Sequence, residues 1–306
     1  MSASGTDAEV VVRTVGLTKT YGRTIALREV DLTINAGEVF GYLGPNGAGK
    51  TTTIRLLMGM LRPTAGHAEV LGHDAWTGGL EVRGRIGYLA GEPALYERLT
   101  GRQHVEYFSW LRRRDPAGDR DRAAAMAKRL DLDLSRPART LSKGNKQKLS
   151  IVLALMSAPE LLILDEPTTG LDPFVQQEFH AMVREHTAGG GSVLLSSHVL
   201  AEVQRVATRI GVVRAGRLIA VERLDTLRGR SLHHVTAQLA DQVGAEEFAG
   251  LPDLRDIEIS DHSFSCSAPQ SALDGLVKQL SRHPIVDFSC TEAELEETFL
   301  AYYADR

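Results

Sequence analysis

The feature that most constrains this chain is a glycine-rich stretch at 44–52, which reads Gly44-Pro45-Asn46-Gly47-Ala48-Gly49-Lys50-Thr51-Thr52. It fits G-x-x-x-x-G-K-[ST], the pattern of the phosphate-cradling P-loop. The apolar run 39–43 before it predicts a buried parallel strand, and the apolar spacing of 52–58 after it predicts a helix. Glycines let backbone N–H groups turn toward an anion, and the helix N-terminus adds its positive dipole end. The stretch therefore predicts a nucleotide phosphate site.

Four side chains have the chemistry that a magnesium-nucleotide site requires. We expect Lys50 to reach the β- and γ-phosphates and the Thr51 hydroxyl to ligate Mg²⁺. The apolar strand 161–165 ends in Asp165, a carboxylate that can hold the metal. The next residue, Glu166, can accept a proton from an attacking water. A buried strand that ends in two carboxylates downstream of a P-loop predicts that these groups meet at one site.

Two further residues stand where a ligand can reach them. His198 follows the apolar strand 192–197, at a strand edge where α/β sheets collect their ligands, so it can hydrogen-bond a γ-phosphate or orient a water. Tyr21 has two interpretations, since its ring can stack on an adenine or can belong to a tyrosine at a sheet edge. The residues alone leave that choice open.

The sequence pattern changes near residue 226, which predicts two domains, 1–226 and 227–306. Residues 10–35 alternate like strands, and a helical insertion at about 95–158 separates two parts of the nucleotide site. The second domain is expected to be a small α/β accessory unit. Its strand-like runs are 234–239, 257–266 and 285–290, and its helical runs are 272–280 and 292–303.

Charge and hydropathy limit the partners and the compartment. The net charge is −4 and the isoelectric point is near 6.2, whereas a nucleic-acid surface is usually strongly basic, so no nucleic-acid partner is expected. The longest apolar stretch, 149–164, is interrupted by polar residues and cannot span a membrane. The start of the chain is polar and acidic, unlike a secretion signal. The two cysteines, Cys266 and Cys290, are expected to be reduced, buried thiols of a cytoplasmic protein.

Four motifs in this order carry a resemblance to a known family. After the P-loop comes the stretch 141–148, which is similar to the signature usually written LSGGQ; it reads Leu141-Ser142-Lys143-Gly144-Asn145-Lys146-Gln147-Lys148. The Asp165–Glu166 strand follows, then a stretch at 170–173 similar to a D-loop, then His198. Over residues 10–222 the chain resembles the ATP-binding subunit of an ABC transporter. The resemblance implies an α/β fold: a P-loop ATPase core with a β-rich N-terminal subdomain and the helical insertion.

The resemblance also implies roles for individual residues. Residues 44–52 would bind the phosphates of ATP, Tyr21 would stack on its adenine, and Thr51 and Asp165 would hold Mg²⁺. Glu166 would be the general base and His198 the γ-phosphate switch. Ser142, Gly144 and Asn145 would contact the ATP bound by a second subunit, and Asp172 would couple the two sites. The partners implied are a second copy, in a head-to-tail homodimer with two shared ATP sites, and an integral membrane permease on whose cytoplasmic side the dimer would sit.

The chain departs from the family pattern at two places. In the signature, Lys143 replaces a glycine and Asn145 replaces a glutamine. The glutamine of the family's Q-loop, expected just after the strand-like run 85–89, is absent; Gly91 stands there, followed by Glu92. The Glu92 carboxylate is an oxygen ligand by chemistry, so it is a candidate metal ligand in place of that glutamine.

Other motifs favour one branch of the family. Residues 92–96 and 294–303 look like those of exporters whose permease is a separate chain, which move drugs, antibiotics, lipids or polysaccharides. The cargo and the role of the C-terminal domain do not follow from the sequence. The alternatives are a soluble ABC-type ATPase acting on ribosomes or DNA and a nucleotide-dependent regulator. A single ATPase domain, an acidic chain and a spacing of about 90 residues from Lys50 to Ser142 disfavour the ribosome and DNA types.

Overall fold

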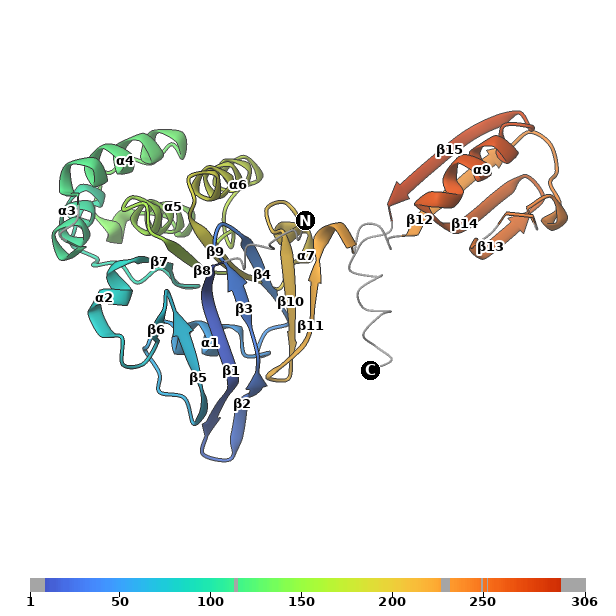
Figure 1. The fold of residues 1–306 in the computed structure, drawn as a ribbon. Coiled ribbons are helices and arrows are strands. Elements are labelled where there is room, and N and C mark those ends of the chain that lie inside the picture. Colours follow the sequence, from blue (N-terminus) through green and yellow to red (C-terminus); the bar gives the residue numbers. More distant parts are fainter. Residues whose placement is uncertain (1–8, 113–114, 227–231, 249, 252, 293–306) are drawn as a thin grey trace, which may run out of the picture. The chain divides into compact units, whose positions relative to one another are not determined.

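The computed structural model describes residues 9–112, 115–226, 232–248, 250–251 and 253–292 (Figure 1). The chain divides into two compact units, 1–222 and 223–306. The first unit contains two sheets and most of the helices, and the second contains one sheet and a covering helix. None of the described helices is long and apolar enough to cross a bilayer.

The six-stranded sheet of the first unit carries the phosphate site. Its strand order is β11-β10-β4-β9-β8-β7, and the printed pairs among β10, β4, β9, β8 and β7 are parallel. All residues of the three central strands are buried, which explains why they read as continuous apolar runs. The strands are β4 (Val39–Leu43), β7 (Ile86–Leu89), β8 (Leu161–Asp165), β9 (Ser192–Ser197), β10 (Arg209–Arg214) and β11 (Arg217–Arg223).

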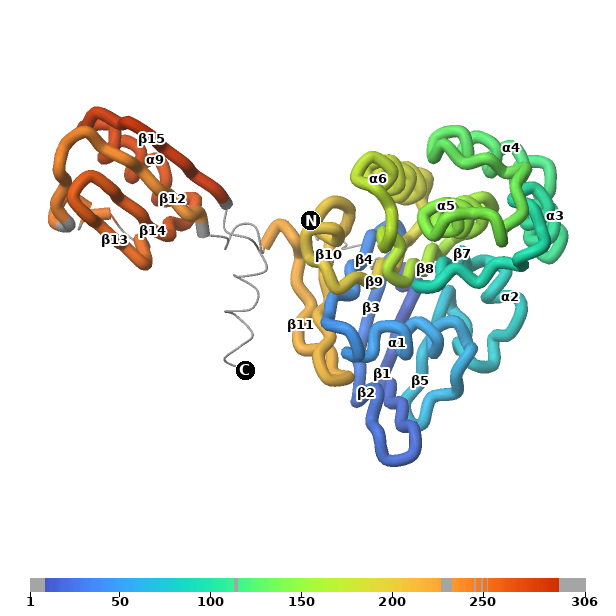
Figure 2. The backbone as a smooth tube through the Cα atoms, turned by 180° about the vertical axis from the view of Figure 1, so that it is seen from behind, coloured from blue at the N-terminus to red at the C-terminus, as the bar shows by residue number. Residues whose placement is uncertain are grey.

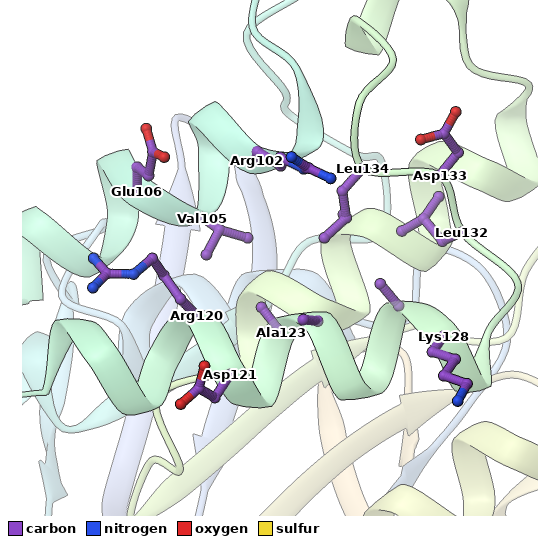
Figure 3. Close-up of a pocket in the computed structure, with 12 residues that line it drawn as sticks. Arg102, Val105, Glu106, Arg120, Asp121, Ala123, Lys128, Leu132, Asp133 and Leu134 are labelled. Atoms are coloured by element: carbon purple, nitrogen blue, oxygen red, sulfur yellow. The ribbon is translucent and has the colours of Figure 1, made fainter.

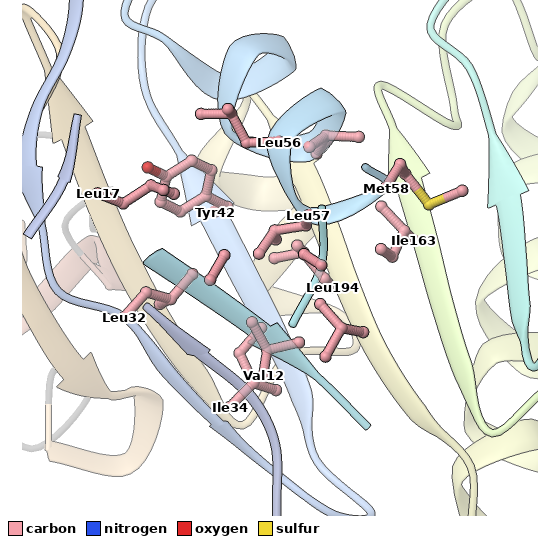
Figure 4. Packing of buried hydrophobic residues seen from close by; sticks show 14 of the residues in the cluster. Val12, Leu17, Leu32, Ile34, Tyr42, Leu56, Leu57, Met58, Ile163 and Leu194 are labelled. Carbon is pink, nitrogen blue, oxygen red and sulfur yellow. The ribbon is translucent and has the colours of Figure 1, made fainter. Parts of the chain in front are cut away.

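The second sheet of this unit is antiparallel and confirms the β-rich N-terminal subdomain. Strand β1 is its centre, paired with β2, β3 and β5, and β5 pairs β6. Leu17 and Ile34 from this sheet pack with Tyr42 and Ile163 of the parallel sheet and with Leu57 of helix α1 (Figure 4). The strands are β1 (Val10–Tyr21), β2 (Thr24–Val30), β3 (Thr33–Asn35), β5 (Ala65–Val70) and β6 (His73–Asp74).

Helices of this unit start at side-chain caps where the sequence supplies them. Asp115, Ser142 and Asp172 each accept a hydrogen bond from the backbone N–H three residues later. Helices α3, α4 and α5 form the expected helical insertion and gather at one end of the unit (Figure 2). The helices are α1 (Lys50–Leu57), α2 (Gly79–Gly84), α3 (Gly101–Arg112), α4 (Pro116–Arg129), η1 (Ala138–Thr140), α5 (Lys143–Leu155), α6 (Pro173–Ala188) and α7 (Leu200–Gln204).

The second unit is a small α/β fold, as expected. Its antiparallel sheet has the order β13-β14-β12-β15, and alternate residues such as Val235 and Phe264 are buried with Leu276 of the helix α9. The unit also holds a short helix, η2 (Ala245–Glu247). The elements are β12 (Leu232–Leu239), β13 (Arg255–Ser260), β14 (Ser263–Pro269), α9 (Gln270–Leu280) and β15 (Ile285–Glu292).

Two details of this unit differ from the expectation. The alternating run 257–266 spans a hairpin, in which Asp261 turns the chain with φ at 37°. Both cysteines are free, but only Cys266 is buried, which raises its pKa to about 11; Cys290 is exposed because β15 is an edge strand. The helix expected at 292–303 lies almost wholly outside the described residues.

Candidate functional site

The P-loop connects β4 to α1, in the strand and helix context that the sequence predicts. A Cβ on Gly44 would lie 2.3 Å from the Val213 carbonyl oxygen, and a Cβ on Gly49, at φ 112°, would lie 2.6 Å from Leu27 Cδ2. Hydrogen bonds from Ala48 N to Pro45 O and from Gly216 N to Ala48 O fix the turn. The first N–H groups of α1 have no intrahelical acceptor, so this end of the helix can bind an anion.

Lys50 reaches back over the loop from the first turn of α1. Its side chain is only 6% exposed, and its Nζ donates to Gly44 O at 2.6 Å and to Pro45 O at 3.3 Å. Nζ also lies 3.2 Å from Oε1 of Glu166. A buried ammonium therefore stands inside the curve of the loop, where a phosphate group would meet it.

Asp165 is held by hydroxyl groups from two elements. Thr51 Oγ1 donates to Asp165 Oδ2 at 2.8 Å, and Ser196 Oγ donates to Asp165 Oδ1 at 2.5 Å. Parallel pairing places Asp165 of β8 directly beside Ser196 of β9. A carboxylate and a threonine hydroxyl side by side are oxygen ligands of the kind that Mg²⁺ prefers.

Glu166 is the first residue past β8 and has a left-handed backbone, with φ at 49°. Ser196 anchors it, because Glu166 N donates to the Ser196 carbonyl at 3.1 Å. Oε2 of Glu166 lies 2.8 Å from His198 Nδ1, whereas Oε1 is buried and has no hydrogen-bond partner. Non-glycine residues in this conformation are strained and often mark functional sites. The site thus holds one carboxylate oxygen that the chain itself leaves unsatisfied.

Tyr21 ends β1 with its side chain 46% exposed. Lys19 Nζ lies 5.1 Å from the centre of its ring. The hairpin that Tyr21 begins continues into β2, whose Leu27 lies against Gly49 of the P-loop. The ring is therefore exposed on a hairpin that packs against the loop.

The signature stretch begins α5. Exposed Ser142 caps the helix by accepting from Asn145 N at 3.3 Å. A Cβ on Gly144 would lie 3.1 Å from Gly170 O, so the signature and the D-loop stretch pack closely. Gln147 Nε2, which is buried, donates to Pro167 O at 2.8 Å and ties α5 to the end of β8.

Asp172 is placed by α6, the helix that follows the D-loop stretch. Its side chain caps α6 by accepting from Val175 N at 3.0 Å. Phe174, in the first turn of α6, is 82% exposed. The first turn of α6 therefore leaves an apolar ring exposed to solvent.

At the Q-loop position, the residue beside Asp165 is Gly91. A Cβ there would lie 3.6 Å from Asp165 Oδ2, whereas Glu92 is exposed. The described residues contain no group of three or more His, Cys, Asp and Glu side chains that could hold a metal. A metal role for Glu92 therefore stays a prediction.

Sequence reasoning missed two residues that organise the site, Ser196 and Gln147. Ser196 bonds both carboxylate residues, and Gln147 fixes α5 to the segment after Glu166. The available signal was a polar side chain at a buried position: Ser196 ends an apolar strand, and Gln147 lies on the apolar face of its helix.

A cavity of about 520 Å³ lies between α3 and α4, apart from these residues (Figure 3). Its wall is apolar near Val105 and Leu134, and charged groups of both signs surround it. None of the expected site residues lines it. The phosphate-binding residues instead surround an open edge of the sheet.

Comparison with known proteins agrees with this geometry. Residues 27–169 match the family model described as ABC transporter. The chain is 39% identical to the daunorubicin resistance ATP-binding protein DrrA3 of Streptomyces coeruleorubidus, with 97% of each chain covered. It is 33% identical to the bacitracin transport ATP-binding protein BcrA of Bacillus licheniformis, with 76% of each covered.

Solved structures show the same fold. One, an ATP-binding subunit of an ABC transporter, has a TM-score of 0.68 at 31% identity and covers 72% of this chain and 92% of its own. Another, a dimeric ATP-binding cassette in a post-hydrolysis state with ADP and Pi, has a TM-score of 0.64 at 25% identity and covers 70% and 98%. The chain belongs to the ABC transporter family, as one of its ATP-binding, ATP-hydrolysing subunits.

Proposed function

We propose that the chain powers a drug- or antibiotic-type exporter through a separate permease, as a head-to-tail homodimer that hydrolyses two shared ATP molecules. The observation that carries the hydrolytic part is the position of Glu166. Its carboxylate lies between Lys50, at 3.2 Å, and His198, at 2.8 Å, one residue from Asp165. A general base and a phosphate-binding cation are thus held at one point.

The residues divide the work as follows. Residues 44–52 hold the phosphates by backbone N–H groups and by Lys50, which would exchange its carbonyl acceptors for phosphate oxygens. Thr51 Oγ1 and Asp165 would hold Mg²⁺, which would neutralise charge on the phosphates. Glu166 would accept the proton of the attacking water, and its orphaned Oε1 is available for this purpose. His198, hydrogen-bonded to Oε2, would orient that carboxylate and sense the γ-phosphate.

The other half of each site comes from the second copy. Ser142, Gly144 and Asn145 lie at the N-terminus of α5, where free N–H groups suit a phosphate. Asp172 and Tyr21 keep the roles that the family resemblance implies, in coupling the two sites and in stacking on adenine. The dimeric cassette that shares this fold supports a paired assembly.

The transport part rests on the relatives. One is called a daunorubicin resistance protein and another a bacitracin transport protein, and both are ATP-binding subunits. We therefore assign an export direction, an amphipathic drug or antibiotic as cargo, and a position on the cytoplasmic face of the membrane, bound to the permease. The test is co-purification of the full chain with the permease encoded beside it. ATPase activity that rises when the two are combined would support the assignment; a chain that binds no such permease would overturn it.

The role of Glu166 has its own test. Glu166→Gln is expected to lower ATP turnover about 10²–10⁴-fold, the usual contribution of a general base, without weakening ATP binding. Glu106→Gln, on the exposed face of α3, is the matched control and should retain turnover. Unchanged turnover in Glu166→Gln would remove Glu166 as the base.

The alternative function is a nucleotide-dependent regulator that scarcely hydrolyses ATP. The observation that favours it is Gly91, which leaves no side chain beside Asp165 at the Q-loop position. A wild-type chain that binds ATP but shows no turnover, even with its permease, would establish this alternative.

A further inference from the structure

We propose that Lys143 of one copy forms an ion pair with Glu92 of a second copy at the rim of each shared phosphate site. The inference rests on the head-to-tail dimer proposed above and adds a contact specific to this chain. The two residues are the charged departures from the family pattern, and their charges are opposite.

Lys143 stands where a cation is unfavourable for the folded chain alone. It is the first residue of α5, whose first turn contains no acidic residue, so its charge opposes the positive end of the helix dipole. Its stem extends beside Gly170, where an added Cβ would lie 3.8 Å from Lys143 Cδ and Cε. The side chain is exposed, and within the described part of the chain its Nζ forms no ion pair. The surface therefore presents an oriented, uncompensated cation.

Glu92 is the corresponding anion. It follows Gly91, whose backbone lies against the Asp165 carboxylate, so Glu92 is at the edge of the phosphate site. Its side chain is exposed, and among the residues that the structure describes it has no cationic partner. An unpaired carboxylate at this edge also adds to the negative charge of Asp165 and Glu166, which a phosphate ligand would meet.

A second copy is the partner that satisfies both groups. In a two-fold dimer, any contact from the signature of one copy to the phosphate site of the other occurs twice. A single pair of residues therefore yields two ion pairs, one at each ATP. Opposite charges placed across an interface favour the correct partner and register, and close pairs contribute measurably to affinity.

The γ-phosphate of ATP is the other anion that Lys143 could meet. The two possibilities differ in their dependence on Glu92. If Lys143 binds phosphate, reversing the charge at residue 143 weakens the dimer regardless of the residue at 92. If Lys143 pairs with Glu92, reversing both charges restores the contact.

The experiment uses the full chain in a Glu166→Gln background, which should accumulate the ATP-bound dimer. Dimer dissociation constants are measured by sedimentation with ATP and Mg²⁺, and ATP binding to dilute monomer is measured in parallel. Lys143→Glu and Glu92→Lys should each weaken the dimer about 10-fold or more, while monomer ATP affinity stays within about 3-fold. The double variant should return to within about 3-fold of the parent.

The matched control places the same charge change one turn away on α5. Lys146→Glu alone should have a smaller effect, and its combination with Glu92→Lys should show no rescue. Failure of the Lys143→Glu/Glu92→Lys double variant to recover overturns the ion pair and leaves the dimer standing. A parent that stays monomeric with ATP overturns the dimer itself, and the pair with it.

Discussion

The phosphate site and the signature stretch lie on the same unit but are built differently. At the phosphate site, every charged or hydroxyl group is tied to another element: Lys50 to Glu166, Thr51 and Ser196 to Asp165. In the signature, the side chain of Ser142 is bonded only to its own helix and is exposed. The first region is finished by intramolecular contacts. The second presents its groups outward, which is the arrangement expected of a surface completed by a partner.

This difference predicts that changes at the phosphate site act on one copy, whereas changes at the signature act only on the pair. The largest effect is expected for Lys50→Ala. Removing the ammonium deletes a charge-assisted contact to phosphate and leaves Glu166 without its cation, so ATP affinity should fall at least about 100-fold and turnover should be lost. Equilibrium binding of a fluorescent ATP analogue checks this.

Lys128→Ala, on helix α4, is the control for Lys50→Ala and should bind ATP normally. Thermal unfolding of both variants separates loss of binding from loss of fold. Full retention of ATP affinity in Lys50→Ala would refute the P-loop assignment.

The next effect sharpens the comparison at Ser142. Ser142→Ala removes the cap of α5, at a cost of about 1 kcal/mol of stability, and should lower turnover about 10-fold, while ATP binding to the monomer is unchanged. Ser142→Asp retains capping, because aspartate caps as well as serine, but adds a negative charge toward the partner's phosphate. It should therefore keep its stability and still lose turnover. If turnover follows stability in both variants, Ser142 is only a cap.

The parts of this structure that sequence could predict are those that local physics determines. The buried strands β4, β8 and β9 and the P-loop between β4 and α1 follow from apolar runs and glycine placement. The roles of Ser196 and Gln147 could not be predicted, because they depend on which strands lie side by side and on where α5 packs. Likewise, Gly91 appeared only as a missing glutamine until the fold placed its backbone against Asp165.

The smallest expected effect concerns α6, which carries the signature side through its cap, Asp172. Burial, and then the nearby Arg205 and Arg184, lower the pKa of His180 to about 4, whereas an unfolded histidine titrates near 6.5. Since the unfolded chain binds the proton first, this contribution to stability is complete above about pH 6.5 and is lost as the pH falls toward 4.

His180→Gln should therefore flatten the fall in unfolding free energy between pH 7 and pH 4.5 by about 2 kcal/mol, as measured from urea midpoints. The exposed His262→Gln is the control and should leave the slope unchanged. Because α6 also positions the D-loop stretch against Gly144, acid should weaken the ATP-dependent dimer of the wild type before it weakens nucleotide binding by the monomer. Equal loss of both would mean that the two regions do not open independently.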